Sequence, residues 1–319
     1  MNLIWVIAQK EIKDILRSKI FIYSLILLLA LTGISTFVSS AVFHDQLLQY
    51  QDSIAFLQSI GRDVNTAAPT LFPLNLLRGA VDYVEIIGAI LGIFLGYISV
   101  SKEKTSKTLP LIFTRPVTEK QVSYGKLLGN LIFIATLCAA ITIFIAGVLI
   151  FFANAPLNFL EYFKLFLFTI LSSVYILIFF ALSFWLSARN KVLVNALIFA
   201  FVIWIGVVLI LPQIGDTMDP DNQVPGGFFK SMGMTKDQEL KVMGELGYYE
   251  KIRTGVEQLS IAKHYERPAF ALFGIKKTYN GMPLLAILND RKFNFLLIVV
   301  VLFLLVELDI RAVRQWKNI

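Results

Sequence analysis

Long apolar runs alternate with shorter polar segments along this chain. A bilayer core about 30 Å thick needs roughly 20 consecutive apolar residues in a helix to cross it. Six runs reach or approach that length, and the pattern predicts a membrane-spanning helix for each: 20–41, 81–100, 127–152, 163–186, 192–214 and 293–308. Only 187–191 separates the fourth run from the fifth, so these two should form a helical hairpin. The expected fold is an all-α polytopic membrane protein with six transmembrane helices.

The polar positions place the remaining segments outside the hydrocarbon. The first five spans occupy 20–214 and the sixth 292–308, with outer loops at 42–80 and 153–162. The other segments are 1–19 at the start, 101–126 between the second and third spans, 215–291 between the fifth and sixth, and 309–319 at the end.

Charge sets the expected orientation. Fifteen Lys and Arg residues lie in the segments before the first span, between the second and third, between the fourth and fifth, and after the sixth. The outer loops hold two. Because basic residues concentrate on the cytoplasmic side, both termini should be cytoplasmic, in a multi-pass protein of the plasma membrane. The segment 215–291 would then be extracytoplasmic, since long domains are translocated largely regardless of their charge.

Composition supports a membrane protein and narrows the possible chemistry. Hydrophobic residues make up 57% of the 319 residues and charged residues only 16%, against about a quarter in soluble domains. The Lys and Arg residues that give the net charge of +7 cluster beside apolar runs rather than along one face, which argues against a nucleic-acid partner. The single cysteine, Cys138, excludes a disulfide framework and a cysteine-based metal site. His44 and His264 are isolated, so we expect surface residues rather than ligands.

The N-terminal segment 1–19 has the pattern of an amphipathic helix lying in the membrane interface. Apolar residues recur at helical spacing, whereas the opposite face is polar. Trp5 is a candidate interfacial anchor. The simpler alternative is a basic flank that only fixes the topology. The apolar positions are Leu3, Ile4, Ile7, Ala8, Ile12, Ile15 and Leu16, and the polar ones are Gln9, Lys10, Lys13, Asp14 and Arg17.

The segment 215–291 should be partly helical. It opens with the turn-rich sequence GDTMDPDNQVPGG. Thr235 and Gln238 form a capping-box pattern, which predicts a helix over 236–246, and a second helix is expected over 249–264. We expect this insertion to pack as a cap on the outer ends of the spans, with the binding of cargo or an extracytoplasmic partner as the alternative.

Two carboxylates, Asp82 and Glu85, stand where the second apolar run begins. Intramembrane carboxylates can bind protons or cations. The interpretation we favour is that Asp82 caps the helix with Glu85 in its first turn, where the helix dipole stabilises negative charge.

The polar stretch 101–129 is more elaborate than a simple connection requires. Pro110 and Pro116 interrupt any continuous helix, and Thr118 with Gln121 is a second capping-box pattern. We predict a short helix over 106–113, a turn, and a new helix leading into the third span. The short helix would present Leu109, Ile112 and Phe113 with a basic rim to an apolar groove, or alternatively rest on lipid headgroups.

Residues of this stretch and of the N-terminal helix resemble a known family. They are similar to the pattern between the second and third spans of ABC (ATP-binding-cassette) type-2 exporter permeases, roughly E-x-x-x-x-T-L, then [ST]-R-P-[VI]-[ST], then G-K. The resemblance looks closest to the branch that includes the permease for nitrous-oxide-reductase maturation, although the long 215–291 insertion departs from the family pattern. The matching residues are Glu103, Thr108-Leu109, Thr114-Arg115-Pro116-Val117-Thr118 and Gly125-Lys126, with Ile7-Ala8, Lys10-Glu11 and Arg17-Ser18 resembling the N-terminal elbow helix.

The resemblance implies that 101–118 is a coupling helix that sits in a cleft of a separate ATPase subunit. It implies two ATPase copies holding ATP and Mg, and a second six-span permease, of the same or a similar chain. It also implies an elbow helix with Lys10, Glu11 and Arg17. The implied coupling residues are Glu103, Thr108, Leu109, Ile112, Phe113, Arg115 and Pro116.

Three functional classes follow. The first is the membrane subunit of an ABC exporter. The sequence lacks the nucleotide-binding motif G-x-x-x-x-G-K-[ST], so we expect ATP hydrolysis in a partner subunit and no cofactor in this chain. The second is an ABC-like sensor or accessory complex without net transport. The third is a membrane-embedded enzyme, which would need convergent reactive groups that these spans hardly contain. Spans rich in Phe, Leu and Ile favour a lipid-like, amphipathic or peptide cargo over a small ion.

Overall fold

The computed structural model describes residues 3–60, 72–106, 116–152, 157–219, 228–245 and 247–315. Within these ranges the secondary structure is helical, with no strand. Six helices are long and apolar enough to cross a membrane: Ile22–Ser59, Pro73–Thr105, Glu119–Phe152, Phe159–Arg189, Leu193–Thr217 and Leu284–Gln315. Each contains most or all of one predicted span, so the all-α, six-span architecture is confirmed.

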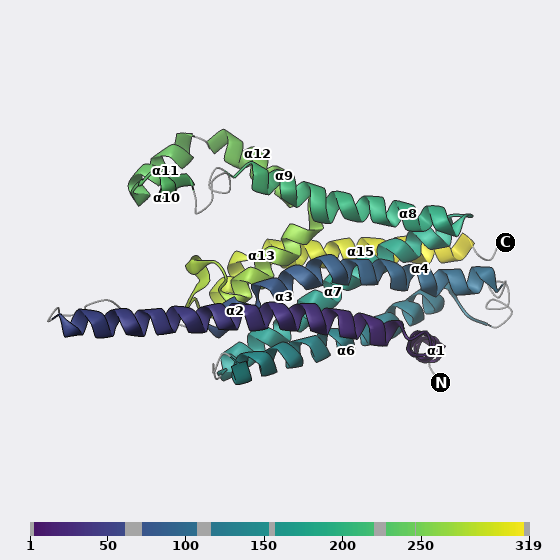
Figure 1. The fold of residues 1–319 in the computed structure, drawn as a ribbon. Coiled ribbons are helices and arrows are strands. Elements are labelled where there is room, and N and C mark those ends of the chain that lie inside the picture. The colour runs from purple at the N-terminus through teal and green to yellow at the C-terminus, as the bar shows by residue number, and fades with distance from the viewer. Residues whose placement is uncertain are drawn as a thin grey trace.

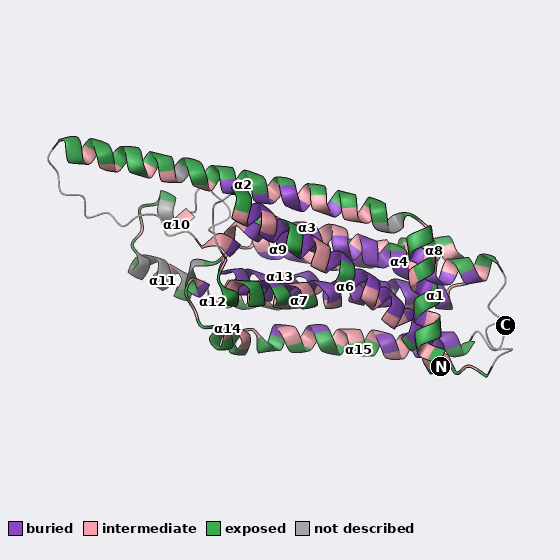
Figure 2. Cartoon of the chain, turned by 90° about the horizontal axis from the view of Figure 1, so that it is seen from below, coloured by how far each residue is buried: buried purple, intermediate pink, exposed green. Residues whose placement is uncertain are grey.

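The spans lie side by side, and the marked N and C ends lie at the same end of the bundle (Figure 1). We call this the terminal end and the opposite one the distal end. The first helix, α1 (Leu3–Arg17), runs crosswise to the spans at the terminal end, as expected of a helix lying in the membrane interface (Figures 1 and 2). Lys19 adopts a left-handed backbone conformation, with φ of 57°, where the chain turns from α1 into the first span.

The first span belongs to a much longer helix than the apolar run suggests. Helix α2 (Ile20–Ser59) has 40 residues, which at 1.5 Å per residue is about 60 Å, twice the hydrocarbon thickness. Its distal half projects beyond the bundle and is largely exposed (Figure 2). The prediction of an outer loop from residue 42 onward is therefore wrong over 42–59, because the polar residues there continue the helix outside the apolar zone.

The second and fourth spans form the tightly packed centre of the bundle. Helix α4 (Ala89–Thr105) lies against α7 (Phe159–Arg189) along Gly92 and Gly96, and Gly88, just before α4, also faces α7. A Cβ atom at Gly92 would lie 2.4 Å from the backbone oxygen of Ile176, and one at Gly96 would lie 2.3 Å from that of Phe180. Only glycine permits these contacts, because any side chain would push the two backbones apart.

The second span begins earlier than its apolar run. A 3₁₀ turn, η1 (Pro73–Leu77), leads into α3 (Arg78–Tyr83), a π-helical segment η2 (Val84–Gly88) and α4. Asp82 therefore lies inside a continuous helix, far from its N-cap at Phe72, and Glu85 is buried. The capping interpretation of these two carboxylates is wrong.

The fifth span also contains a π-helical segment. It runs through α8 (Leu193–Trp204), η3 (Ile205–Ile210) and α9 (Leu211–Thr217). Such segments carry an extra residue per turn and are frequently found at functional sites. Spans two and five are the spans in which the described residues show this feature.

The insertion between spans five and six is helical and enters the bundle. It contains α10 (Phe228–Ser231), α11 (Lys236–Glu245), α12 (Gly247–Gln258), α13 (Ile261–Phe273) and η5 (Lys277–Tyr279). The sixth span then begins with α14 (Leu284–Asp290), which leads into α15 (Lys292–Gln315). The capping box of Thr235 and Gln238 at the start of α11 is confirmed. The single helix predicted over 249–264 is instead two helices, because Ser260 caps α13 and donates a hydrogen bond to the Val207 carbonyl oxygen at 2.6 Å.

Helix α13 packs among the spans rather than only on their outer ends. Tyr265 stacks on Tyr175 near the middle of α7, with ring centroids 4.3 Å apart, and both rings are fully buried. His264 is also buried and pairs with the side chain of Asn294 at 2.9 Å. The expectation of a surface histidine was wrong for His264, whereas His44 is exposed on α2.

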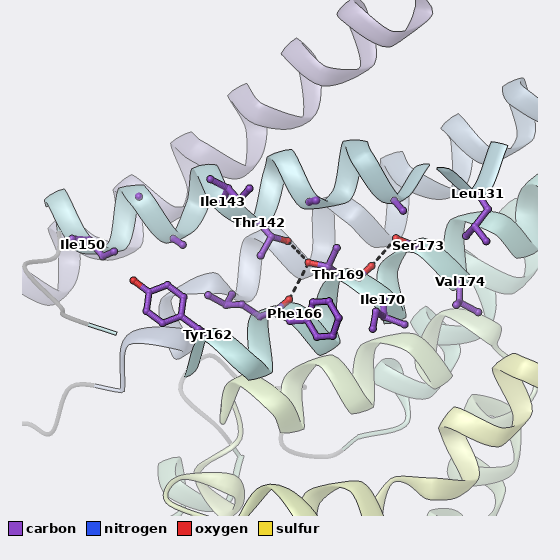
Figure 3. Close-up of a pocket in the computed structure, with 15 residues that line it drawn as sticks. Leu131, Thr142, Ile143, Ile150, Tyr162, Phe166, Thr169, Ile170, Ser173 and Val174 are labelled. Carbon is purple, nitrogen blue, oxygen red and sulfur yellow. Dashed lines mark hydrogen bonds between the residues drawn. The ribbon is translucent and has the colours of Figure 1, made fainter. Parts of the chain in front are cut away.

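A groove of about 890 Å³ runs between α6 (Glu119–Phe152) and α7. Three of its hydroxyl groups are hydrogen-bonded within the protein, since the Thr169 hydroxyl pairs with that of Thr142 at 2.9 Å and Ser173 donates to the Thr169 carbonyl oxygen (Figure 3). The remaining walls are apolar side chains such as Ile143 and Phe166, both well exposed. This groove therefore suits contact with hydrocarbon.

Candidate coupling site

Three elements converge at the terminal end of the bundle. Helix α1 crosses the start of α6 where Gly125 and Gly129 face it. A Cβ atom at Gly129 would lie 2.7 Å from the backbone oxygen of Ala8, and one at Gly125 would lie 2.6 Å from the Cβ atom of Ile7. These two glycines, one turn apart, let the backbone of α1 lie directly on α6, next to the end of α4.

Helix α1 buries a narrow face that includes a charge. Its buried residues are Ala8, Glu11 and Ile15, whereas Trp5 is 45% exposed on another face, as an interfacial anchor would be. Glu11 is one of the residues that carry the family resemblance, but a charged residue is not expected on the buried face of a helix. Its burial is explained by the basic side chains that surround it.

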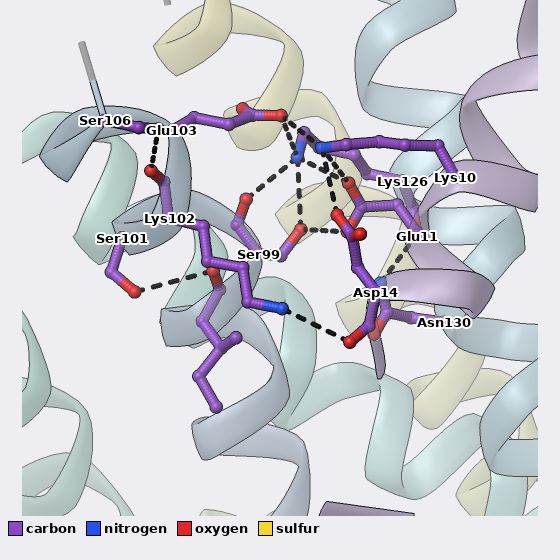
Figure 4. A network of polar contacts seen from close by, with 11 residues as sticks. Lys10, Glu11, Asp14, Ser99, Ser101, Lys102, Glu103, Ser106, Lys126 and Asn130 are labelled. Atoms are coloured by element: carbon purple, nitrogen blue, oxygen red, sulfur yellow. Dashed lines mark hydrogen bonds and ion pairs between the residues drawn. The ribbon is translucent and has the colours of Figure 1, made fainter. Parts of the chain in front are cut away.

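Charged side chains from all three elements form one cluster with a buried centre, the coupling-end cluster, shown in Figure 4. The Lys126 ammonium group, 1% exposed, lies 2.9 Å from a carboxylate oxygen of Glu11 and 2.9 Å from one of Glu103. Lys10 reaches the same oxygen of Glu103 at 3.1 Å. Each carboxylate is thus shared by two ammonium groups, an arrangement that offsets the large cost of burying charge.

Neutral groups complete the coupling-end cluster. Ser99 donates to the second oxygen of Glu11 at 2.9 Å, and its carbonyl oxygen accepts from Lys126 at 2.8 Å. Lys10 also lies 3.4 Å from Asp14, one turn along α1. The space left among these groups is about 10 Å³, too little for a ligand.

The ionisation of the α1 groups follows from these contacts. Burial alone would raise the pKa of the Glu11 carboxyl, but Lys126 and Lys10 outweigh it, so the pKa of Glu11 lies below its ordinary value. Burial would lower the pKa of Lys10, but the carboxylates of Glu11 and Glu103 more than compensate, so the pKa of Lys10 is raised. Both groups are therefore charged at neutral pH.

A family model described as ABC-2 family transporter protein matches residues 5–309, nearly the whole chain and all of this cluster. The chain belongs to the ABC-2 transporter family. No curated protein matches it. It is accordingly an integral, multi-pass membrane subunit of an ABC transporter, in a family whose members are transport subunits rather than enzymes and generally work with a cytoplasmic ATPase.

A further contact ties the end of the second span of this ABC-2 subunit to the fourth. Lys104 donates to three backbone oxygens at the end of α7, those of Ser187 at 2.7 Å, Ala188 at 3.0 Å and Asn190 at 2.7 Å. Carbonyl groups at a helix C-terminus have no partner within the helix and carry partial negative charge, so a lysine is well suited to them. The last turn of α4 is thereby fixed on two sides.

The structure brings together three of the residues implied by the family resemblance: Lys10, Glu11 and Glu103. Arg17 is exposed in the last turn of α1 and forms no ion pair with any residue that the structure describes. Pro116 is exposed just before the capping box of Thr118 and Gln121, which is present and starts α6. The other implied coupling residues lie outside the described residues: Thr108, Leu109, Ile112, Phe113 and Arg115.

The sequence did not predict that Lys126, Ser99 and Asn130 take part in the cluster. Lys126 was noted only as the lysine of the G-K pattern, although a lysine seven residues into a long apolar helix indicates a buried partner. Asn130, 1% exposed, donates to the Lys126 carbonyl oxygen at 2.9 Å. Ser99 gives no sequence signal, because serine is common in membrane helices.

Proposed function

We propose that this chain is the permease subunit of an ABC exporter, driven by a separate ATPase that docks on the segment 101–118. In this arrangement two ATPase subunits bind ATP and Mg, and the permease receives their closure as a mechanical displacement. Both termini and the docking segment lie on the cytoplasmic side of the plasma membrane.

The coupling-end cluster is the observation that carries this proposal. Glu103 lies in the part of the docking segment that ends α4, Lys126 lies in α6 beyond the segment, and these two side chains are joined by an ion pair of 2.9 Å. Lys10 and Glu11 extend the same network to α1. A displacement of the segment is therefore passed to the second span, the third span and the interfacial helix together.

Further partners follow from the same proposal. Family resemblance implies twelve spans, so a second six-span subunit, of this or a similar chain, completes the transporter. The insertion between spans five and six offers a surface for an extracytoplasmic partner. Membership of the branch that includes the permease for nitrous-oxide-reductase maturation stays a hypothesis, which the genes next to this one would test.

Capture of an ATPase subunit tests the docking step. The permease is co-expressed with the candidate ATPase and purified through a tag on the permease. Phe113→Asp and Arg115→Glu should abolish copurification, because they put charge into the apolar face and reverse the basic rim. Phe159→Asp and Arg314→Glu are matched controls, since both residues are exposed and lie outside the segment. Capture that survives both test variants would overturn the docking assignment.

Transport in sealed vesicles separates an exporter from an ABC-like sensor or accessory complex. ATP-dependent movement of a labelled amphiphile should require both the permease and an active ATPase. The control carries an ATPase without its catalytic glutamate. An ATPase that is captured and active, while the vesicles show no movement of any tested amphiphile above this control, would favour the sensor.

A further inference from the structure

A cavity of about 790 Å³ opens at the distal end of the bundle. Its walls come from the start of α3, the end of α9 and the helices α12 and α13, so the second span, the fifth span and the insertion all contribute. Nine of its thirteen lining residues are charged. A cavity of this size matches the usual volume of small-molecule sites, whereas its charge density is far above theirs.

Most of these charges are paired with one another across the walls. Lys263 on α13 lies 3.3 Å from Asp216 on α9 and 2.8 Å from Glu266. Arg253 on α12 lies 2.7 Å from Asp219, just after α9. In a further pair, the guanidinium group of Arg267 meets Glu257. The pairs hold α9, α12 and α13 together, and their three cations and four carboxylates sum to a charge of −1.

Two cations remain without such a partner. Arg78 and Lys276 both line the cavity, and neither has a carboxylate within 4 Å among the residues that the structure describes. The Arg78 guanidinium lies over the ring of Phe270, 5.6 Å from its centroid, which restrains it at the wall. Asp82, one turn further along the helix, lies beyond ion-pair distance of Arg78 but interacts with it electrostatically. The lining residues, five basic and four acidic, carry a net charge of +1, and Arg78 and Lys276 are its two cations outside the ion pairs.

An apolar groove adjoins the charged cavity. It has a volume of about 540 Å³ and is lined by Leu209, Ile210, Ile214 and Met218 of the fifth span. Gln213 and Thr217 line both spaces, so the cavity and the groove lie on adjacent faces of the same helix. A ligand with a charged head and a hydrocarbon tail could occupy both at once.

We propose that the cavity and the groove together bind an amphiphile with an anionic head, a phosphate or a carboxylate. The head lies between Arg78 and Lys276, and the tail lies along Leu209 and Ile214. That this amphiphile is the cargo rests on the proposed transport function. The binding itself does not depend on that function.

Isothermal titration with dodecyl phosphate tests the binding, using the purified full chain in phosphatidylcholine nanodiscs without any ATPase. Arg78→Gln with Lys276→Gln should weaken binding at least tenfold. Both side chains are exposed and outside the paired network, so the variant should fold, as its thermal midpoint will show. Exchanging the two cations, Arg78→Lys with Lys276→Arg, should retain binding. Lys251→Gln is the matched control, because Lys251 is exposed on α12 and does not line the cavity.

The tail and the source of the ligand are tested in the same assay. Ile214→Asn should weaken dodecyl phosphate binding, whereas Leu285→Asn, at an exposed distal position, should not. Inorganic phosphate that binds as tightly as dodecyl phosphate would overturn the role of the groove, and dodecanol that binds equally well would overturn the role of the cations. Loss of binding in nanodiscs rich in phosphatidylglycerol would assign the site to bilayer lipid and overturn the cargo assignment. Because the binding assay contains no ATPase, its results can be interpreted even if the permease fails to capture an ATPase.

Discussion

The bundle carries a network of charged side chains at each end, and the two networks differ in what fills the space between them. At the terminal end Lys126, Glu11 and Glu103 are at most 6% exposed and leave about 10 Å³. At the distal end nine charged residues surround about 790 Å³. The first network is closed by the chain's own groups. The second contains two cations, Arg78 and Lys276, that form no ion pair with the other charged residues of the cavity wall.

The difference shows how one kind of side chain can serve two purposes. Where every charge meets an opposite charge in a dry, filled space, the network joins helices, and removing one member leaves the others buried and unpaired. Where the charges line an open space, water screens them and a missing member costs little. The contrast predicts that equivalent substitutions will have unequal effects at the two ends.

The largest effect is expected at Lys126. Lys126→Met leaves Glu11 and Glu103 without their shared buried cation and should destabilise the protein by roughly 3–5 kcal/mol. Thermal unfolding in detergent, followed by near-ultraviolet circular dichroism, measures the loss. Lys120→Met, an exposed position on the same helix, is the control. Adding Glu11→Gln and Glu103→Gln to Lys126→Met should recover part of the midpoint, and no recovery would contradict the role of the pairs.

A smaller loss is expected where α1 crosses α6. Gly129→Ala puts a Cβ atom 2.7 Å from the Ala8 backbone oxygen, and displacing α1 should cost about 1–3 kcal/mol. Gly147→Ala is the matched control, because a Cβ there meets nothing within 4 Å. The same unfolding assay applies. Equal midpoints for the two variants would show that the close crossing is not required.

At the distal end the loss of a cation should be mild. Arg253→Gln removes contacts with Asp219 at 2.7 Å, Glu250 at 3.0 Å and Glu257 at 4.0 Å, but it does so in an open cavity, so we expect about 1 kcal/mol or less. Added salt should shrink this difference further, since partly exposed pairs that face open water are screened by ions. A midpoint loss as large as that of Lys126→Met would remove the distinction between the two networks.

The smallest effect is expected in the contribution of Glu11 to stability, which should depend on pH only under acidic conditions. The pKa of Glu11 is lowered from an ordinary value of 4.5, so its stabilising contribution is present above that value and is lost as the pH falls through the lowered pKa. The difference in thermal midpoint between the wild type and Glu11→Gln should therefore stay constant from about pH 8 to 5.5 and decline only below about pH 4.5. A decline already between pH 8 and 6 would show that Glu11 is not held ionised by its lysine partners.

The spans could be predicted because crossing a bilayer imposes a length and an apolarity on consecutive residues. Their ends could not, because nothing in a polar sequence says where a helix stops once it has left the hydrocarbon. Helix α2 continues to Ser59, and the second span starts at Pro73, so Asp82 lies inside a helix rather than at its cap. The proline at the first helical position was the available signal.

Some of the candidate site residues could be predicted from the sequence, and others could not. Glu103, Lys10 and Glu11 were found through short motifs that resemble a family, and the structure joins them. Lys126 read as an ordinary flanking base, since burial depends on partners 115 and 23 residues away along the chain. The pairing of His264 with Asn294 and the stacking of Tyr265 on Tyr175 arise only when the insertion folds back among the spans.

The glycine contacts between α4 and α7 have a mechanical consequence. With two backbones in direct contact and Lys104 bound to the end of α7, the two helices resist sliding and act as one rigid rod. Helix α3 continues α4 and carries Arg78, while α13 is stacked on α7 and carries Lys263. Two of the helices that wall the distal cavity, α3 and α13, are therefore connected to that pair of helices, whereas α9 and α12 supply the remaining walls. The ion pair between Lys263 and Asp216, 3.3 Å long, joins α13 to α9 across the cavity.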